Sequence, residues 1–386
     1  MTREQNCSDN PRPRGISRRE FIKLAAMVGL LAGCRPLEKL GTPTSPSAPT
    51  SPPPPTTPPA PTSSPIPTPM PTAVPTVTPT PVPTATPLLR RPEIIKFYPD
   101  GPSKVVRARH AGVWDGESLV PEAIRQMLDA SITALTGLTD AGEAWAALFA
   151  PSERVAIKVN TIDASSFWTH VPLVLAVAEC LQEIGIPSEQ IIIFDRLTYE
   201  LKNAGYPINQ DGPGVRCYGT ETEYTTDWTV MNSKVGLSNI LLSCDALINM
   251  PVLKTHSISG FTFAMKNHYG TFDRPRRFHA GIQRAIPELN ALPPIRDRTR
   301  LIIGDALTVC VRGWHKAVIG DSILMSFDPV AHDTVGLQVL GEVMTSEGID
   351  PKTATNLSSR WLENGTELGL GTNDPDNIDL IEVTVE

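Results

Sequence analysis

A basic segment between residues 249 and 279 contains the residue types best suited to chemistry on an anion. It holds three of the seven histidines (His256, His268 and His279), together with two lysines and three arginines. The chain has a net charge of −7, and residues 1–88 contribute +4, which leaves −11 for the remainder. A local inversion of charge within an acidic domain is what a bound anion requires.

The spacing within this segment predicts which side chains converge. If residues 253–257 are extended, Lys254 and His256 point to the same side. If residues 261–269 form a helix, Thr262 and Lys266 share a face of it, and Gly260 lets the backbone turn into that helix. The N–H groups at the start of such a helix, beside Lys254, would attract phosphate or carboxylate.

We expect a site with four candidate catalytic residues and five candidate ligand-binding residues. In this hypothesis His256 is the acid or base, the lysines hold the anion, and an arginine clamps it through two hydrogen bonds. The alternative is a solvated basic loop with structurally satisfied histidines. The catalytic candidates are His256, Lys254, Lys266 and Asp305, and the ligand-binding candidates are Lys158, Asn160, Asn267, Arg277 and His279.

The elements that must position these residues alternate between strand-like and helix-like patterns. This alternation predicts an α/β fold, with a mainly parallel or mixed sheet and helices on both faces. We expect strands at residues 104–109, 154–160, 190–195, 245–250, 300–305 and 322–327, and helices at residues 118–135, 172–184 and 329–342.

Polar side chains stand at or near the ends of five apolar runs: Asn160, Asp195, Asn249, Asp305 and Asp328. In a parallel sheet such residues meet at one edge, where ligands bind. Each of them could instead be a turn former or helix cap, and Asp328, before Pro329, is best read as an N-cap. Asp195 and Asp305 are the candidates for a divalent metal ligand, and Asp305 also for a general base.

Four segments resemble the family named domain of unknown function 362: residues 155–160, 245–256, 265–270 and 326–333. The resemblance extends over about residues 105–340. It implies an α/β fold and a shared site, but the family has no settled reaction. Some members carry ferredoxin-type cysteine clusters, which this chain lacks.

The cysteines and the charge exclude several classes of protein. None of the six cysteines forms a C-x-x-C pair, so there is no iron–sulfur cluster motif. The pairing of the last four is left open; they are Cys180, Cys217, Cys244 and Cys310. An acidic domain is a poor partner for nucleic acid, which needs a wide basic surface.

The N-terminus resembles a signal peptide for export. Residues 17–23 (Ser-Arg-Arg-Glu-Phe-Ile-Lys) resemble a twin-arginine signal, and residues 31–34 (Leu-Ala-Gly-Cys) resemble a lipobox. We therefore expect passage through the twin-arginine export machinery and attachment to the outer face of a bacterial membrane through lipidated Cys34. The alternative is an ordinary amphipathic start with a chance pair of arginines. The twin-arginine route carries folded proteins, so a cofactor is permitted but not implied.

A proline-rich stalk follows the predicted signal. Residues 41–88 contain 19 prolines in 48 positions and no charged side chain. Such a composition favours polyproline II and a disordered linker that extends to at most ~150 Å. We expect three parts: the signal at residues 1–34, the linker at 35–88 and the α/β domain at 89–386.

Three functions fit these residues. The first is an enzyme that acts on an anionic small molecule or envelope component, in which Asp195 or Asp305 orients His256 or binds a divalent metal. The second is a lipoprotein that binds such a ligand without changing it. The third is a carrier of a metal or redox cofactor, which would need the histidines to converge with an acid.

Overall fold

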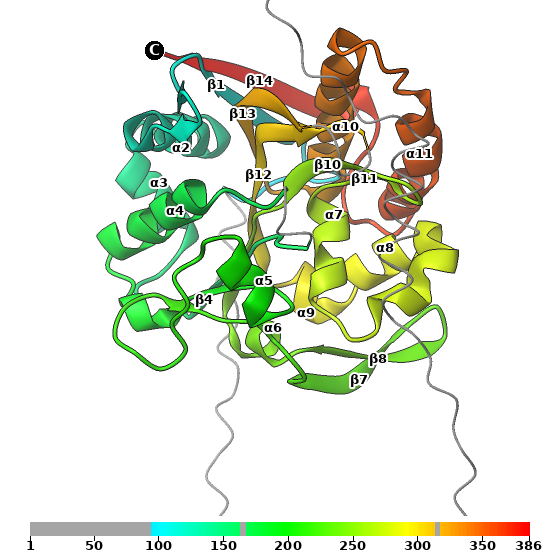
Figure 1. Cartoon of the computed structure of the whole chain (residues 1–386), viewed down its shortest axis with the longest axis horizontal. Coiled ribbons are helices and arrows are strands. Elements are labelled where there is room, and N and C mark those ends of the chain that lie inside the picture. Colours follow the sequence, from blue (N-terminus) through cyan, green and yellow to red (C-terminus); the bar gives the residue numbers. More distant parts are fainter. Residues whose placement is uncertain (1–93, 163–166, 313–316) are drawn as a thin grey trace, which may run out of the picture. The chain divides into compact units, whose positions relative to one another are not determined.

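The computed structural model describes residues 94–162, 167–312 and 317–386. The predicted signal, Cys34 and the proline-rich linker lie outside the described residues. Figure 1 shows strands in the middle of the domain and helices on either side of them.

One sheet of ten strands organises the domain. Its order is β14-β1-β13-β12-β9-β4-β5-β6, with β10 paired to β12 and β11 paired to β10. The strands from β12 to β6 run parallel to one another, whereas β13 runs antiparallel to both of its neighbours. The strands are β1 (Ser103–His110), β4 (Val155–Lys158), β5 (Ile191–Phe194), β6 (Arg216–Cys217), β9 (Ala246–Asn249), β10 (Val252–His256), β11 (Gly260–Thr262), β12 (Thr299–Cys310), β13 (Ala317–Ser326) and β14 (Ile378–Val385).

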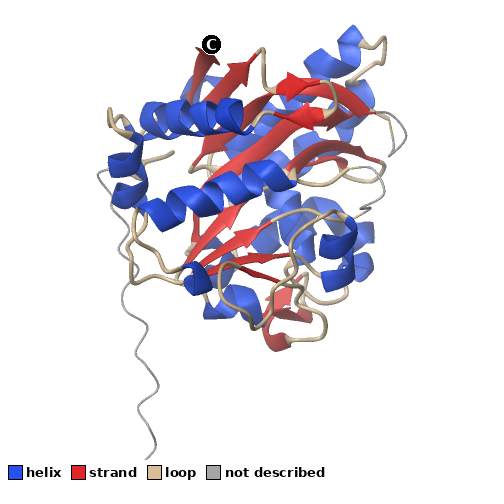
Figure 2. Ribbon diagram, turned by 60° about the vertical axis from the view of Figure 1, so that its left-hand side comes forward, coloured by secondary structure: helices blue, strands red, loops and turns tan. Residues whose placement is uncertain are grey.

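Helices cover both faces of the sheet, as the sequence predicts (Figure 2). Successive strand residues face opposite sides, and in β4 Ala156 belongs to one hydrophobic core while Ile157 belongs to the other. One core includes helices α2 (Pro121–Thr136), α3 (Ala141–Leu148) and α4 (Val171–Glu183), and the other includes α8 (Ile282–Asn290), α10 (Pro329–Ser346) and α11 (Lys352–Glu367). The predicted α/β class with a mixed sheet is confirmed.

Shorter elements connect this framework. They are β2 (Trp114–Asp115), β3 (Ser118–Leu119), β7 (Tyr224–Val230), β8 (Ser233–Ser238), α5 (Thr198–Asn203), α6 (Asn239–Ser243), α7 (Ala264–Asn267), α9 (Pro293–Arg296) and the 3-10 helices η1 (Ser188–Gln190), η2 (His268–Gly270), η3 (Pro275–Gly281) and η4 (Pro375–Asn377). The sequence did not predict the β7–β8 hairpin, because its turn uses Met231 and Asn232 at φ 48° and 60° in place of a recognisable Asn-Gly pair.

The direction of β13 corrects one expectation about the sheet edge. Asn160, Asp195 and Asn249 follow or end parallel strands and therefore share an edge. Asp328 follows the antiparallel β13 and lies at the opposite edge. There its carboxylate accepts hydrogen bonds from the N–H groups of Val330 and Ala331, which confirms its role as the N-cap of α10.

The four cysteines of the domain are buried free thiols. Burial raises the pKa of Cys217 to about 12, so its thiol is unreactive at neutral pH. None of the helices in the described ranges is long and apolar enough to cross a membrane.

Candidate functional site

A cavity of about 550 Å³ opens at the edge of the sheet where the parallel strands end. The segment from β10 to η3, which holds the basic residues, forms its other wall. The lining residues are Lys158, Asn160, Ile162, Asp195, Arg196, Leu197, Tyr199, Glu200, Lys254, His256, Thr262, Lys266, Asn267, Tyr269, Gly270, Pro275, Arg276 and His279. Seven of the nine predicted catalytic and ligand-binding residues are therefore in one cavity.

A buried ion pair forms the sheet side of the cavity. The Nζ of Lys158 lies 2.7 Å from Oδ1 of Asp195, and both side chains are almost completely buried. The other carboxylate oxygen of Asp195 accepts hydrogen bonds from the backbone N–H and the hydroxyl of Thr161, at 2.7 and 2.9 Å. Gly270 closes over the pair, because a Cβ there would stand 2.5 Å from Oδ1 of Asp195. Every oxygen of Asp195 is thus occupied, which does not suit the predicted role as a metal ligand.

Three asparagines join the ends of the strands to α7. Asn267 accepts a hydrogen bond from the side chain of Asn160 at 3.1 Å and donates one to Asn249 at 2.7 Å. Asn249 in turn donates to the carbonyl oxygen of Ala264 at 2.8 Å. This network fixes α7 at the sheet edge, so Asn160 and Asn267 position the wall of the cavity.

Lys254 projects from β10 into the same network. Its Nζ donates to Oδ1 of Asn160 at 2.7 Å and to the carbonyl oxygens of Ile162 and Phe167 at 3.3 and 3.4 Å. These contacts hold the ammonium group of Lys254 at the cavity wall, which is the place the sequence predicts for it.

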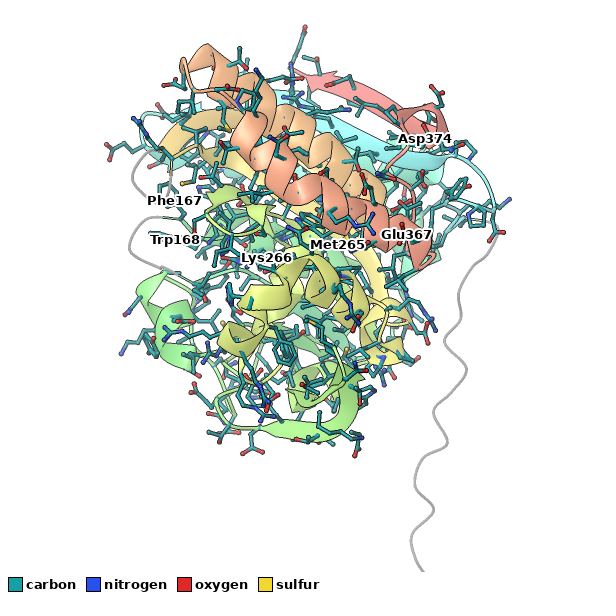
Figure 3. The ribbon with its side chains drawn as sticks, turned by 90° about the vertical axis from the view of Figure 1, so that its right-hand side faces the viewer. Phe167, Trp168, Met265, Lys266, Glu367 and Asp374 are labelled. Carbon is teal, nitrogen blue, oxygen red and sulfur yellow. The ribbon has the colours of Figure 1, made fainter. Side chains whose placement is uncertain are left out.

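Lys266 is a buried lysine of a different kind. It is 7 % exposed, comes from α7 (Figure 3), and makes no hydrogen bond or ion pair with the residues that the structure describes. Its Nζ lies 4.6 Å from the ring centroid of Tyr269. Burial and, second, the charge of Lys254 lower the pKa of Lys266 to about 7. A large fraction of this side chain is therefore a neutral amine at physiological pH.

His256 and His279 face each other across the cavity wall, with ring centroids 5.8 Å apart. The Nδ1 of His256 accepts hydrogen bonds from the backbone N–H groups of Ile258 and Ser259, so the ring proton is on Nε2. Burial, followed by the charge of Lys266, lowers the pKa of His256 to about 3. The predicted acid/base role of His256 near neutral pH does not fit, and the geometry suits a neutral hydrogen-bond donor.

The local structure also differs from the helix expected at residues 261–269. Thr262 belongs to β11, where it pairs with Lys254, and α7 has only four residues. Asp333 accepts hydrogen bonds from the N–H groups of Ala264 and Met265, at 2.7 and 2.9 Å. The predicted binding of an anion by this helix start is wrong, because a carboxylate of the protein already occupies those donors.

Asp305 lies away from the cavity, within β12. Its Oδ2 accepts hydrogen bonds from the backbone N–H of His170 at 2.7 Å and is 2.8 Å from His170 Nδ1. Thr308 lies 3.2 Å from the other ring nitrogen. Three strand spacings of about 4.8 Å separate the strands of Asp195 and Asp305, or about 14 Å. The two aspartates therefore do not share a metal site, and Asp305 is not placed to act in the cavity as a catalyst.

The expected arginine clamp is displaced by one residue. Both Arg276 and Arg277 are exposed, but only Arg276 is among the described residues that line the cavity. His268 is buried on the far side of α7, where its Nε2 is 3.3 Å from the amide of Asn249. Of the three histidines in the basic segment, two therefore reach the cavity.

Sequence reasoning missed the residues contributed by the segment after β5. Arg196, Tyr199 and Glu200 line the cavity. Burial, followed by the charge of Asp195, raises the pKa of Glu200 above its usual value. The signal was available, because these residues directly follow a strand whose end was expected at the ligand-binding edge.

The described residues offer no set of side chains that could hold a metal ion. No group of three or more His, Cys, Asp or Glu side chains there could hold a metal ion. The cavity instead presents amines, amides and neutral imidazoles, which bind anions and carbonyl groups.

Comparison with known proteins gives a family and distant structural likenesses. No curated protein matches the chain. The apoprotein of lactate racemase from Thermoanaerobacterium thermosaccharolyticum aligns at 11 % identity and a TM-score of 0.35, over 64 % of this chain and 57 % of its own. A protein from Thermotoga maritima aligns at 11 % identity and a TM-score of 0.37, over 66 % and 60 %. The chain thus spans less than two thirds of either protein.

The family model described as domain of unknown function (DUF362) matches residues 155–338. The match begins later than the resemblance noted from the sequence, but it includes β4, the whole basic segment and the start of α10. The predicted family is confirmed, and this part of the chain belongs to the domain of unknown function 362 family.

Proposed function

We propose that this protein is an extracytoplasmic, lipid-anchored enzyme that binds an anionic small molecule in the cavity at the sheet edge. One observation carries the proposal: five Lys and Arg side chains line the cavity against two carboxylates. Lys158 and Asp195 neutralise each other. Among the other described lining residues, the basic side chains outnumber the acidic ones by four to one: Lys254, Lys266, Arg196 and Arg276 against Glu200. A positive, partly desolvated cavity in an otherwise acidic domain favours an anion.

An enzyme fits this cavity better than a passive binding site. A binding site needs charged partners, whereas Lys266 is held so that much of it is neutral. A neutral amine at pH 7 binds an anion more weakly than an ammonium group, but it can accept a proton or attack an electrophile. His256 supplies a hydrogen-bond donor beside it.

Anion binding is the first test of the proposal. We expect full-length protein to bind inorganic phosphate or small carboxylates in isothermal titration calorimetry, with affinity at least tenfold lower in Lys254→Ala. Arg277→Ala is the matched control and should change affinity less than twofold. Equal effects of the two substitutions, or no binding of any anion by the wild type, would contradict an anion site in this cavity.

Catalysis is tested on the ligands that bind. NMR spectroscopy of a bound ligand incubated with wild-type protein should reveal chemical change that Lys266→Met abolishes. A ligand that is bound and recovered unchanged would favour a non-catalytic binding lipoprotein instead.

Export and lipidation can be tested separately in a bacterial host. We expect the full-length chain in the membrane fraction, with incorporation of a palmitate label that Cys34→Ser abolishes and Cys7→Ser leaves intact. Replacement of Arg18 and Arg19 by lysine should retain the chain in the cytoplasm. Label that persists in the Cys34→Ser variant would show that the anchor is elsewhere, and a wild-type chain without label would show that it has no lipid anchor.

A further inference from the structure

Lys266 and Tyr269 form the least satisfied polar group of the cavity. Lys266 has no hydrogen-bond or ion-pair partner among the described residues, and its Nζ lies over the ring of Tyr269 at 4.6 Å from the centroid. Tyr269 is 6 % exposed, and its hydroxyl also lacks a hydrogen-bond partner within the described part of the chain. An unsatisfied buried polar group costs about 1–3 kcal/mol. The Tyr269 hydroxyl is such a group, whereas Nζ of Lys266 is open to the cavity and has no partner there among the described residues. A ligand group is therefore the partner that the amine of Lys266 lacks.

Both groups are held rigidly. Lys266 is on α7, whose first N–H groups are fixed by Asp333 and whose last residue, Asn267, is bonded to the strand ends. Tyr269 packs edge-on against Phe272 and His279 at 5.4 and 5.6 Å. The helix that carries Lys266 and the ring beneath its amine are therefore in place before any ligand arrives.

We propose that Nζ of Lys266 forms an imine with an aldehyde or ketone that also carries a carboxylate or phosphate group. This inference rests on the proposed function, since it assumes that the cavity binds an anion. Lys254 and Arg276 would bind the anionic group, and the Nε2–H of His256 would donate a hydrogen bond to the carbonyl oxygen.

The chemistry needs no oxidant, reductant or cofactor. The lone pair of Nζ attacks the carbonyl carbon, a C–N bond forms, and the C–O π electrons move to oxygen. One proton moves from nitrogen to that oxygen, which gives a carbinolamine. The C–O bond then breaks, the second nitrogen proton leaves with the oxygen as water, and a C=N bond remains. Such a step requires the neutral amine, and the lowered pKa of Lys266 supplies it at pH 7.

The two histidines offer a hydrogen-bond donor and a hydrogen-bond acceptor to the reacting groups. The Nε2 of His256 carries a proton, because its Nδ1 accepts two backbone hydrogen bonds. His279 is the opposite tautomer, since its Nδ1 lies 3.2 Å from the carbonyl oxygen of Pro275 and donates to it, which leaves a lone pair on Nε2. A donor and an acceptor thus lie side by side at the cavity wall, with ring centroids 5.8 Å apart.

Reductive trapping tests the inference directly. Full-length protein is incubated at pH 7 with sodium cyanoborohydride and either pyruvate or glycolaldehyde phosphate, and the product is examined by intact-mass and peptide mass spectrometry. We expect one adduct per chain, on Lys266, with at least one of the two probes. The two probes distinguish a carboxylate-bearing from a phosphate-bearing substrate. Lys266→Arg should abolish the adduct, and Lys352→Arg, at an exposed lysine, should leave it unchanged.

Two outcomes would overturn the inference. Adducts spread over exposed lysines in proportion to their exposure would show that Lys266 has no special reactivity. No adduct on Lys266, in protein that still binds pyruvate or phosphate by calorimetry, would refute the imine while the proposed anion site survives. No binding of either anion would contradict the proposed function as well.

A measurement on the wild type avoids dependence on the folding of the Lys266→Arg variant. Competitive acetylation with trace acetic anhydride across pH 5–11 reports the titration of each lysine. We expect the labelling of Lys266 to reach half its maximum near pH 7, well before that of the exposed lysines as a group. A half-maximum for Lys266 above pH 9 would overturn the inference.

Discussion

Lys158 and Lys266, on two sides of the cavity, are both buried but differ in whether a carboxylate lies beside the amine. At the sheet edge, Lys158 has a carboxylate at 2.7 Å and a backbone carbonyl as partners, and Asp195 has its own further donors. On α7, Lys266 has an aromatic face and a neighbouring cation. Both side chains are more than nine tenths buried, so burial alone does not separate them. The difference is whether the fold provides a counter-charge.

Because of this difference, we expect Lys158 to hold the structure of the site and Lys266 to react with a ligand. The buried Lys158–Asp195 ion pair has its hydrogen-bond partners in place, and it fixes the ends of β4 and β5 relative to each other. A buried amine without a counter-ion is costly as an ammonium group, and it gains reactivity when it loses the proton. We therefore expect substitutions at Lys158 or Asp195 to affect folding first and those at Lys266 to affect reactivity first.

We expect the largest effect on stability from removal of the Lys158–Asp195 ion pair. Asp195→Ala leaves the ammonium group of Lys158 buried without its carboxylate, and we expect a loss of about 3–5 kcal/mol in the free energy of unfolding. Urea denaturation followed by circular dichroism measures it. Glu363→Ala, which breaks an exposed pair with Arg360, is the control and should cost less than about 1 kcal/mol. A comparable small loss in both variants would mean that Lys158 is not held by Asp195.

Replacement of Lys266, which has no counter-ion among the described residues, should instead stabilise the protein. Below pH 7 Lys266 is protonated in both the folded and the unfolded states, and the folded state bears the cost of desolvating the charge. Between pH 7 and about 10.4 the unfolded chain binds a proton that the folded chain has lost, so the stability of the wild type rises with pH. Lys266→Met should therefore stabilise the protein by about 2–4 kcal/mol at pH 6, and this gain should shrink towards pH 10.

Denaturation at both pH values checks this expectation, with Lys352→Met, at an exposed lysine, as the control. A Lys266→Met variant that is less stable than the wild type at pH 6 would show that the ammonium group has a partner, and the contrast with Lys158 would disappear.

The sequence was sufficient to predict that the polar residues at the ends of the parallel strands meet at one edge of the sheet. The strands that precede Asn160, Asp195 and Asn249 are short apolar runs, and parallel strands bring their carboxyl ends to one edge. What the sequence did not reveal was strand direction. The run before Asp328 has the same appearance, but β13 is the return strand of a hairpin with β12, so its end lies at the other edge.

For the basic segment that forms the other wall of the cavity, the sequence predicted that both lysines reach the cavity but not the secondary structure that carries them. Lys254 and Lys266 reach the cavity as expected, but through a β10–β11 pair in place of a longer helix. Gly260 explains the difference: it has φ 85°, and a Cβ there would stand 2.2 Å from the carbonyl oxygen of Ala354 in α11. That contact joins residues almost a hundred positions apart, and a local pattern carries no information about it.

Asp305 and His170 provide an intermediate case, because this ion pair has one fully buried partner and one partly exposed partner. Burial opposes protonation, but the charge of Asp305 and its hydrogen bond outweigh it and raise the pKa of His170 above its usual value. The stabilisation is therefore fully present below the unfolded pKa of about 6.5 and is lost as pH rises through the raised folded pKa.

His170→Gln should accordingly destabilise the protein by about 1.5 kcal/mol at pH 5.5, the value typical of a hydrogen bond to a charged group, and by less at pH 9. His110→Gln, at a half-buried histidine that lies 3.1 Å from the neutral side chain of Gln126, is the matched control. The difference between the two variants should narrow with rising pH in urea denaturation. A His170→Gln effect that grows with pH would mean that Asp305 binds the neutral ring, and the pair would then resemble the uncharged side of the cavity more than the Lys158–Asp195 side.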